Sequence, residues 1–409
     1  MTIMTPLGTT AASAPASASA PAERWARVGH AGHADARTAV AMAYGSLDLP
    51  ERPELVMMYV STSLDPAAAA AAIADLAPGV SLIGCTSRGE LSHSGPAQDS
   101  VVLLALGGAG VRCRTAIAPI VDGDARTAAA TAACCADALD PLASTVMVVL
   151  SDGSGIDQDD VIRGAYDTVG AAIPLVGGGA CGAHLQFDPT LFRQDENGIV
   201  AMSGVVVVAA ITSTGPIGIG VGHGFDPDGE PEVVTASGRN VVTTLGERPA
   251  LDAYLRHHDA PADLFDIPEG FADFALARPL GVARRTRVEP RAVVGADEMA
   301  RTLTMGATVP PGGLVWLMHG DLDSALGAVD VAADDCLDAL GDRTPLVVVA
   351  FDCAARRTVL GEDGLVAEVD RLVGRAGCPV AGLYTYGEIA RTSGSTGFHN
   401  LTVVLLAFG

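Results

Sequence analysis

The sequence lacks long apolar runs and paired cysteine motifs. No apolar stretch approaches the roughly 18 residues that a membrane-spanning helix needs, so we expect no membrane span. The eight cysteines of the 409-residue chain form no C-x-x-C pair or other paired metal spacing. Several lie in apolar or helical contexts, which indicates reduced, buried thiols. We therefore expect a cytoplasmic protein without a metal site.

Basic and aromatic residues are also scarce. Lys and Arg total 25 against 48 Asp and Glu, and the resulting net charge of −23 repels nucleic acid and anionic membranes. Aromatic residues make up 4% of the chain and hydrophobic residues 49%, so small aliphatic side chains must fill a large core. This composition is typical of β/α layers, in which helices pack closely on sheets.

Common catalytic and nucleotide-binding motifs are missing. The chain has no Walker A, H-E-x-x-H or G-x-S-x-G sequence. Gly177-x-Gly179-x-x-Gly182 matches the letters of a dinucleotide fingerprint. The residues after it do not predict the helix whose N-terminus would hold the pyrophosphate. We therefore interpret Gly177–Gly182 as a tight turn.

One pattern is present twice. Residues 82–91 read L-I-G-C-T-S-R-G-E-L, and residues 380–389 read V-A-G-L-Y-T-Y-G-E-I. Each segment begins with a short apolar strand and is followed by a second apolar strand. The shared core, G-x(4)-G-E and an aliphatic residue, indicates a duplication. We expect a ligand in the crevice between the two copies.

Each copy belongs to a unit of strand, helix, strand, loop and strand. One unit covers residues 55–106, a second 145–211 and a third 346–408, while residues 217–311 read as an antiparallel segment. Residues 314–319 are predicted to return to parallel strands. The predicted fold class is therefore α/β, with repeated strand–helix–strand–loop–strand units in two layered modules and an antiparallel segment in the middle.

The domain organisation follows from these units. The N-terminal residues are rich in Ala, Ser, Pro and Thr and lack the basic and apolar regions of a signal peptide. We expect a disordered tail over residues 1–25. An N-terminal module should cover residues 26–247 and a C-terminal module residues 248–409.

Ligands of open α/β sheets bind outside the C-terminal ends of parallel strands. Glu90 and Glu388 follow a glycine at such a turn, where a carboxylate either accepts hydrogen bonds from its own loop or meets a cationic ligand; we favour the structural role. Tyr384 and Tyr386 alternate, so one should pack inward and the other line a pocket. The candidate ligand-binding residues are Cys85, Thr86, Glu90, Asp152, Ser154, Gly178, His184, His319, Asp352, Cys353, Tyr384, Tyr386 and Glu388.

These motifs together resemble the FIST family of bacterial sensory proteins. G-C-T-S-R-G-E-L resembles its N-terminal module, and V-A-G-L-Y-T-Y-G-E-I followed by F-H-N-L-T-V-V-L-L-A-F resembles its C-terminal module. The segments P-L-V-G-G-G-A-C-G and V-G-H-G-F-D-P also look like the family pattern. The likeness covers residues 54–409.

The resemblance implies a ligand-binding sensory protein rather than an enzyme. Its ligand would be a small molecule, such as an amino acid or a related metabolite. Its partner would be a kinase, a cyclic-di-nucleotide enzyme or a chemoreceptor. We find no kinase-like, GGDEF-like or receptor segment in the sequence, so we expect output through such a partner.

A haem-based gas sensor is the first alternative. We predict no cofactor, but some members of the family resemble haem-bound nitric oxide sensors. A haem ligand in this chain would be among His184, His223 and His319. Each of these histidines is more often a hydrogen-bonded structural residue.

An enzyme of unknown class is the second alternative. Asp152 with Ser154, or Asp352 with Cys353, would supply polar groups at strand ends. Such residues more often cap the following helix. The sequence identifies no base that would activate Cys353, so the catalytic constellation is incomplete.

Overall fold

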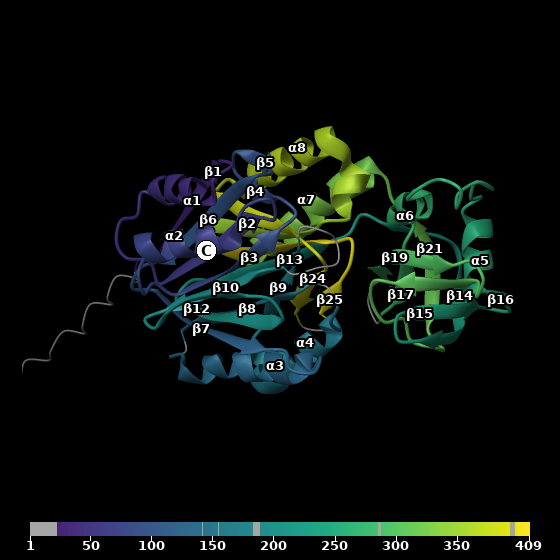
Figure 1. The fold of residues 1–409 in the computed structure, drawn as a ribbon, viewed down its shortest axis with the longest axis horizontal. Helices are drawn as coiled ribbons and strands as arrows, with labels where there is room; N and C mark the ends of the chain where they lie inside the picture. Colours follow the sequence, from purple (N-terminus) through teal and green to yellow (C-terminus); the bar gives the residue numbers. More distant parts are fainter. Residues whose placement is uncertain (1–22, 141, 154, 183–188, 285–287, 393–396) are drawn as a thin grey trace, which may run out of the picture.

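The computed structural model describes residues 23–140, 142–153, 155–182, 189–284, 288–392 and 397–409. Helices and β-sheets alternate along most of this length (Figure 1). The predicted α/β class is therefore confirmed. Within the described ranges, no helix is both long enough and apolar enough to cross a bilayer.

The described elements form three units of one topology and a lobe. Each unit has an outer strand, a helix, a strand, a second helix, a strand, a two-stranded hairpin and a closing strand. Unit 1 comprises β1 (Trp25–Gly32), α1 (Ala36–Gly45), β2 (Leu55–Ser61), α2 (Pro66–Leu76), β3 (Leu82–Ser87), β4 (Glu90–Ser92), β5 (Gly95–Ala97) and β6 (Ser100–Gly107).

Units 2 and 3 repeat this order. Unit 2 comprises β7 (Val111–Pro119), α3 (Ala125–Ala133), β8 (Ser144–Asp152), α4 (Gln158–Val169), β9 (Leu175–Ala180), β10 (Leu191–Asp195), β11 (Gly198–Met202) and β12 (Val205–Ser213). Unit 3 comprises β13 (Ile217–Gly222), α7 (Leu322–Asp338), β22 (Val347–Cys353), α8 (Arg356–Ala376), β23 (Val380–Thr385), β24 (Glu388–Arg391), β25 (Phe398–His399) and β26 (Val403–Phe408). Two short 3-10 turns, Cys134–Ala138 and Gly170–Ala172, follow α3 and α4.

Each unit builds a sheet around two parallel strands and sends its hairpin into another sheet. The parallel pairs are β2 with β3, β8 with β9, and β22 with β23; the closing strand runs antiparallel beside the first strand of each pair. The hairpins are exchanged: β4 pairs with β23, β10 with β3, and β24 with β9. The three sheets are thereby joined in a closed ring.

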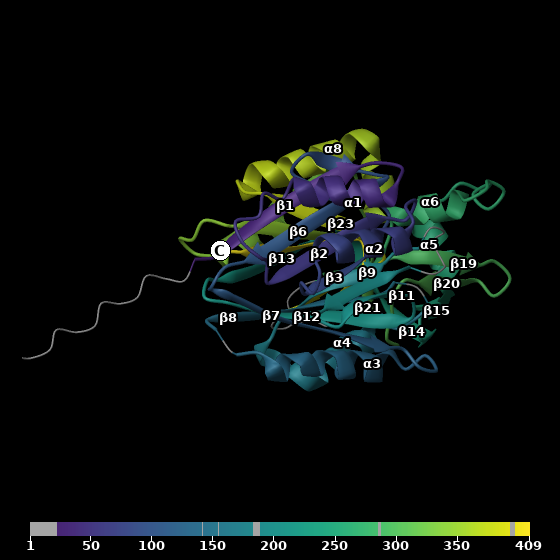
Figure 2. The same cartoon turned by 60° about the vertical axis from the view of Figure 1, so that its left-hand side comes forward.

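One apolar core fills the ring, and helices cover its outside. Tyr59, Val148 and Phe351, one from each unit, are buried in the same central cluster. The outer faces carry α1 and α2, α3 and α4, and α7 and α8, as Figures 1 and 2 show. The buried side of α2 consists of alanines and Ile73, so the helix lies close to its sheet. This packing is the one that the composition predicts.

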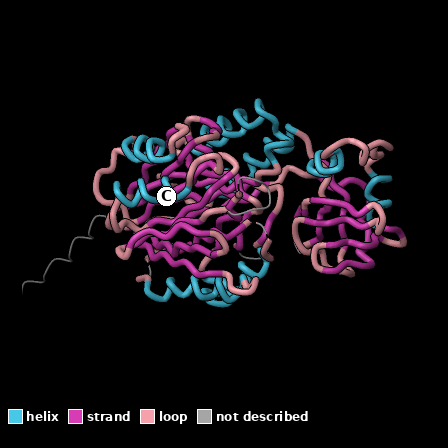
Figure 3. Tube along the Cα trace, viewed as in Figure 1, coloured by secondary structure: helices cyan, strands magenta, loops and turns pink. Residues whose placement is uncertain are grey.

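A separate lobe interrupts unit 3 between β13 and α7. Its antiparallel strands and two helices surround their own core, which includes Val234, Tyr254 and Leu317. Figure 3 shows the lobe as a distinct group of strands beside the ring. It comprises β14 (Asp226–Gly238), β15 (Val241–Leu245), β16 (Arg248–Pro249), α5 (Ala250–His257), α6 (Gly270–Leu276), β17 (Leu280–Ala283), β18 (Val288–Arg291), β19 (Val293–Asp297), β20 (Thr302–Met305) and β21 (Leu314–His319).

The prediction that residues 314–319 return to parallel strands is wrong. This segment is β21, which pairs antiparallel with both β14 and β17 inside the lobe. A short apolar run is expected in any strand that is buried between two neighbours, whether it is parallel or antiparallel to them. The neighbouring strands come from distant parts of the chain, so the run itself does not indicate their direction. His319 is therefore at the end of an antiparallel strand of the lobe.

The prediction of a tight turn at Gly177–Gly182 is also wrong. Residues 177–180 continue strand β9 between β8 and β24. Gly177 has φ +147°, and a Cβ there would lie 1.9 Å from the carbonyl oxygen of Val149. The glycines are therefore needed because neighbouring backbone approaches β9 too closely for side chains, and not because the chain reverses.

Substitution of Gly177 tests this account. Gly177→Ala should lower the free energy of unfolding by about 3 kcal/mol or more, because the new Cβ meets backbone that cannot rotate away. The matched control is Gly374→Ala in α8, where a Cβ meets nothing within 4 Å. That change should stabilise the helix by about 0.5–1 kcal/mol. Urea unfolding of both variants measures the difference, and equal effects would contradict the account.

Candidate functional site

Three loops interlock where the parallel strands end. We call this region the strand-end junction; it comprises residues 86–89, 179–182 and 384–387. The Cys181 N–H donates to the Thr86 carbonyl at 3.1 Å, and the Tyr386 N–H donates to the Gly179 carbonyl at 2.8 Å. The Tyr384 N–H donates to the Gly89 carbonyl at 3.0 Å. Each loop is thus hydrogen-bonded to the other two.

The glycine of each G-E motif shapes its loop. Gly89 has φ +134° and Gly387 has φ +95°, conformations that residues with a Cβ rarely adopt. The following residues, Glu90 and Glu388, are the first residues of the exchanged strands β4 and β24. The motif therefore marks the point at which the chain leaves its own sheet for another one.

Glu90 is fully buried in a pocket of hydroxyl groups. Ser61 at the end of β2, Ser87 at the end of β3 and Ser100 at the start of β6 each donate a hydrogen bond of 2.5 Å to its carboxylate. The three donors come from three strands of unit 1. Glu90, the first residue of the exchanged β4–β5 hairpin, is thereby hydrogen-bonded to the sheet of unit 1.

Glu388 occupies the equivalent place in unit 3. Thr385 donates its hydroxyl at 2.9 Å, and Thr402 donates its hydroxyl at 2.8 Å and its N–H at 3.2 Å. The Cys353 thiol is a further hydrogen-bond partner. Strand register makes Cys353, Thr385 and Thr402 the counterparts of Ser61, Ser87 and Ser100.

Unit 2 lacks this carboxylate. Its exchanged strand begins with Leu191, which lies opposite Cys85 on β3 as Glu90 lies opposite Leu383. The counterparts of the three hydroxyl residues are Asp152, Ala180 and Val205. In unit 2, apolar residues therefore stand at the position of the glutamate and at two of the three donor positions.

Burial sets the protonation of the two glutamates. Removal from water raises the pKa of Glu90 and of Glu388 from 4.5 to about 7, although the hydroxyl donors act in the opposite direction. Both groups make several hydrogen bonds within their own unit, and neither is exposed. These contacts agree with the structural role favoured by the sequence.

Three polar side chains from three different units lie in or next to the junction and are at least partly exposed. Arg88 is exposed, Asp152 is half-buried, and the Tyr386 side chain is 38% exposed. Gly153, next to Asp152, donates its N–H to the Ala180 carbonyl at 3.1 Å. A Cβ on Gly153 would lie 2.8 Å from the Cβ of Tyr386, so these two loops are in contact.

The remaining candidates of the junction are buried. Cys85 lies on β3, Gly178 lies on β9 opposite Glu388, and the Thr86 hydroxyl donates to the Cys181 carbonyl at 2.8 Å. Burial raises the pKa of the Cys85 thiol well above its usual range. The Tyr384 ring is buried beneath the Arg357 guanidinium, 4.5 Å from its centre. These side chains support the junction rather than line its surface.

Asp352 and Cys353 point to opposite faces of β22. Asp352 faces the helices and accepts a 2.8 Å hydrogen bond from Arg356, which also contacts Glu368. All three groups are buried, so they form an internal ion-pair network. Cys353 faces Glu388, and burial raises the pKa of its thiol well above the usual range. The thiolate is the nucleophilic form of cysteine, so this environment does not activate Cys353.

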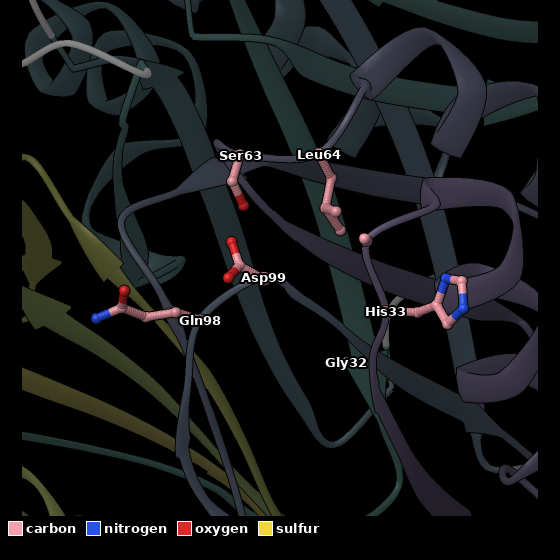
Figure 4. A pocket seen from close by; sticks show the side chains of 7 residues that line it. Gly32, His33, Ser63, Leu64, Gln98 and Asp99 are labelled. Carbon is pink, nitrogen blue, oxygen red and sulfur yellow. The ribbon is translucent and has the colours of Figure 1, made fainter.

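A cavity of about 440 Å³ lies beside the junction in unit 1 (Figure 4). Ser63 and Asp99 point towards one another across it. The corresponding place in unit 3 is filled, because Phe225 and Leu401 pack there against Met318 of the lobe. The two places, one in unit 1 and one in unit 3, are equivalent in strand register. Asp99 and Leu401 each precede the closing strand of their unit, and both have positive φ.

The sequence missed several residues of this region. Ser61, Ser100 and Thr402 are distant in sequence from the glutamates that they bind. Arg88 lies inside the first motif but was not selected. A hydroxyl or thiol at the end of each parallel strand of units 1 and 3 was the available signal. Two predicted candidates, Ser154 and His184, lie outside the described residues.

The two described haem candidates lie at the connections to the lobe. His223 accepts a 3.1 Å hydrogen bond from the Phe225 N–H at Nδ1, and its ring stacks with Phe225 at 6.5 Å between centroids. His319 ends β21 and is exposed. Phe225, Met318 and Leu401 fill the apolar space beside His223, so a porphyrin there would have to displace them.

The haem hypothesis has a spectroscopic test. We expect protein mixed with haemin to show no Soret band that depends on His223 or His319, because packed apolar side chains occupy the space that the ring needs. Absorption spectra of the wild type, His223→Ala and His319→Ala measure this. A Soret band of the wild type that either substitution abolishes would contradict the expectation.

The buried glutamates predict a pH dependence of stability. Each carboxyl holds its proton to a higher pH in the folded state than in the unfolded chain, so stability falls as the pH rises through the window from 4.5 to 7. Between pH 5.5 and 8, each glutamate should cost the wild type about 2 kcal/mol relative to its neutral glutamine variant. Unfolding of Glu90→Gln and Glu388→Gln over this range measures the slope.

The exposed Glu362→Gln on α8 is the control for this experiment, and its slope should equal that of the wild type. Parallel slopes for the wild type and both buried-site variants would show that the two carboxyl groups do not titrate in this window.

Comparison with known proteins identifies two family domains in the chain. The FIST N domain matches residues 54–248, and the FIST C domain matches residues 250–391. An uncharacterised protein of Mycobacterium tuberculosis is 28% identical over 240 residues, which are 57% of this chain and 60% of that protein. One from Mycobacterium bovis is 26% identical over 248 residues, 59% of this chain and 61% of that protein. The matched part is thus less than two thirds of each relative.

Solved structures give only distant similarities. Cyanuric acid hydrolase from A. caulinodans aligns with a TM-score of 0.35 and 10% identity, covering 94% of this chain and 99% of that one. Phosphoribosylformylglycinamidine synthase II from Thermotoga maritima has a TM-score of 0.22 and 13% identity, covering 95% and 72%. Both TM-scores are too low to support a conclusion about this chain. The two domain matches, in contrast, cover most of the chain, which therefore belongs to the FIST family of sensory, small-ligand-binding signalling domains.

Proposed function

We propose that this protein senses a small zwitterion of the amino-acid class, which it binds at the strand-end junction. The observation that carries the proposal is that three units each contribute one accessible polar group there: Arg88, Asp152 and Tyr386. A guanidinium, a carboxylate and a phenol are a set that suits a ligand with both an ammonium and a carboxylate group.

Each group has a distinct role in the proposed complex. The Arg88 guanidinium binds the ligand carboxylate with two parallel hydrogen bonds. The Asp152 carboxylate accepts hydrogen bonds from the ligand ammonium. The Tyr386 ring, which is more exposed than any other aromatic side chain of the junction, forms a wall for the ligand side chain and offers a hydroxyl at its edge.

The interlocked backbone is what turns binding into a signal. Because each loop of the junction is hydrogen-bonded to the other two, a ligand that moves one loop acts on three sheets. A ligand shifts a conformational equilibrium only by its differential affinity for the two states. We propose that a partner protein, such as a kinase, a cyclic-di-nucleotide enzyme or a chemoreceptor, detects this shift.

A reducing compartment suits this protein, and we propose the cytoplasm. All eight cysteines are free thiols, and five of them are buried. Disulfides form and persist in oxidising compartments, whereas thiols are kept reduced in the cytoplasm. The net charge of −23 also argues against nucleic acid as a partner.

A thermal-shift screen with free amino acids and related metabolites tests the proposal. A true ligand at 100 times its dissociation constant should add about 2.7 kcal/mol to the free energy of unfolding. Asp152→Asn should weaken its binding about tenfold or more, because it removes a charge-assisted hydrogen bond. The matched control is Asp370→Asn, which changes an exposed carboxylate on α8 and should leave affinity unchanged. The proposal fails if no compound stabilises the protein, or if both variants bind like the wild type.

A further inference from the structure

The three exchanged hairpins differ in how their outer strands are protected. Strands β5, β25 and β11 each end a sheet and so present one edge without a neighbouring strand in that sheet. Strand β5 has three residues, one of which is Pro96, a residue without an N–H. Strand β25 has two buried residues and lies against β18 of the lobe. Both edges are thus poor templates for a further strand.

Strand β11 has neither form of protection. It has five residues without proline, and four of them are exposed. Val200 is 39% exposed and Met202 42%. Residues 197–213 contain no Asp, Glu or Arg, although the chain as a whole has a net charge of −23. Proteins ordinarily protect such an edge with a charge, a proline or a bulge, because it pairs readily with another strand.

We propose that β11 pairs antiparallel with β11 of a second copy of this chain, around a two-fold axis at Val200. One sheet would then continue through both molecules. In this register Met202 lies opposite the second copy's Gly198, and Ile199 lies opposite its Ala201. Met202 and Ile199 therefore each meet a small residue, and the two Val200 side chains pack against one another at the axis.

Charge favours a second copy over a charged partner at this edge. The paired residues 198–202 carry no charged side chain, and the nearby acids lie elsewhere: Asp195 ends β10 opposite Gly198 of its own chain, and Glu196 follows it in the turn. No like charges are then opposed across the edge. The two acidic molecules still repel one another at longer range, so added salt should strengthen the dimer by screening that repulsion.

Light scattering during size-exclusion chromatography tests the proposal on the full chain. The wild type should have twice the monomer mass of 41.3 kDa, and Val200→Lys should be monomeric because two ammonium groups then meet at the axis. The matched control is Val294→Lys on β19, an exposed valine on a strand that also ends its sheet; this variant should stay dimeric. We expect at least a tenfold rise in the dimer dissociation constant for Val200→Lys alone.

Hydrogen exchange locates the interface without any substitution. Amides 198–202 of the wild type should exchange more slowly in a concentrated sample than in a dilute one, and the lobe should show no such change. The proposal would be overturned by a wild type that is monomeric at 50 times the protein concentration used for hydrogen exchange. In that case the partner of the β11 edge would be a strand of another protein. A folded Val200→Lys that stays dimeric, or protection at a surface other than β11, would also overturn the proposal.

Discussion

The exchange of hairpins between sheets is the constraint on which the rest of this structure depends. No unit completes its own sheet, because β4, β10 and β24 each pair with a strand of another unit. The backbone groups at those edges are satisfied only when all three units are in place. The common core, the interlocked loops and the position of both G-E motifs follow from that pairing.

Chemistry at the junction is divided between buried and accessible groups. Glu90 and Glu388 hold strands together through hydroxyl and thiol donors of their own units, and both side chains are fully buried. Arg88 and Tyr386 on the junction loops are exposed, and Asp152 at the end of β8 is half-buried. A carboxylate that is conspicuous in the sequence is thus buried among hydrogen-bond donors, and the more exposed polar groups of this region are less conspicuous in the sequence.

The sequence predicted what is local and missed what depends on distant strands. The repeated units, the α/β class and the equivalence of Glu90 and Glu388 could be read from apolar runs and from the repeated motif. Hairpin exchange could not, because its partners are far apart in the chain. For the same reason the glycines of β9 read as a turn, since nothing near them in sequence reveals Val149 and Gly387 on either side. Strand β21 read as parallel because a buried apolar run does not identify its neighbours.

The closed ring also constrains the order in which the chain acquires structure. Glu90, near the start of the described chain, takes its place in a sheet only after Leu383, near the end, has been synthesised. Strand β4 of unit 1 therefore stays without its partner until β23 is present, whereas β10 of unit 2 can already pair with β3 of unit 1. Contacts of such long sequence separation slow folding and prolong the exposure of apolar edges. Until β23 has been synthesised, the β4–β5 hairpin therefore lacks the sheet that it joins.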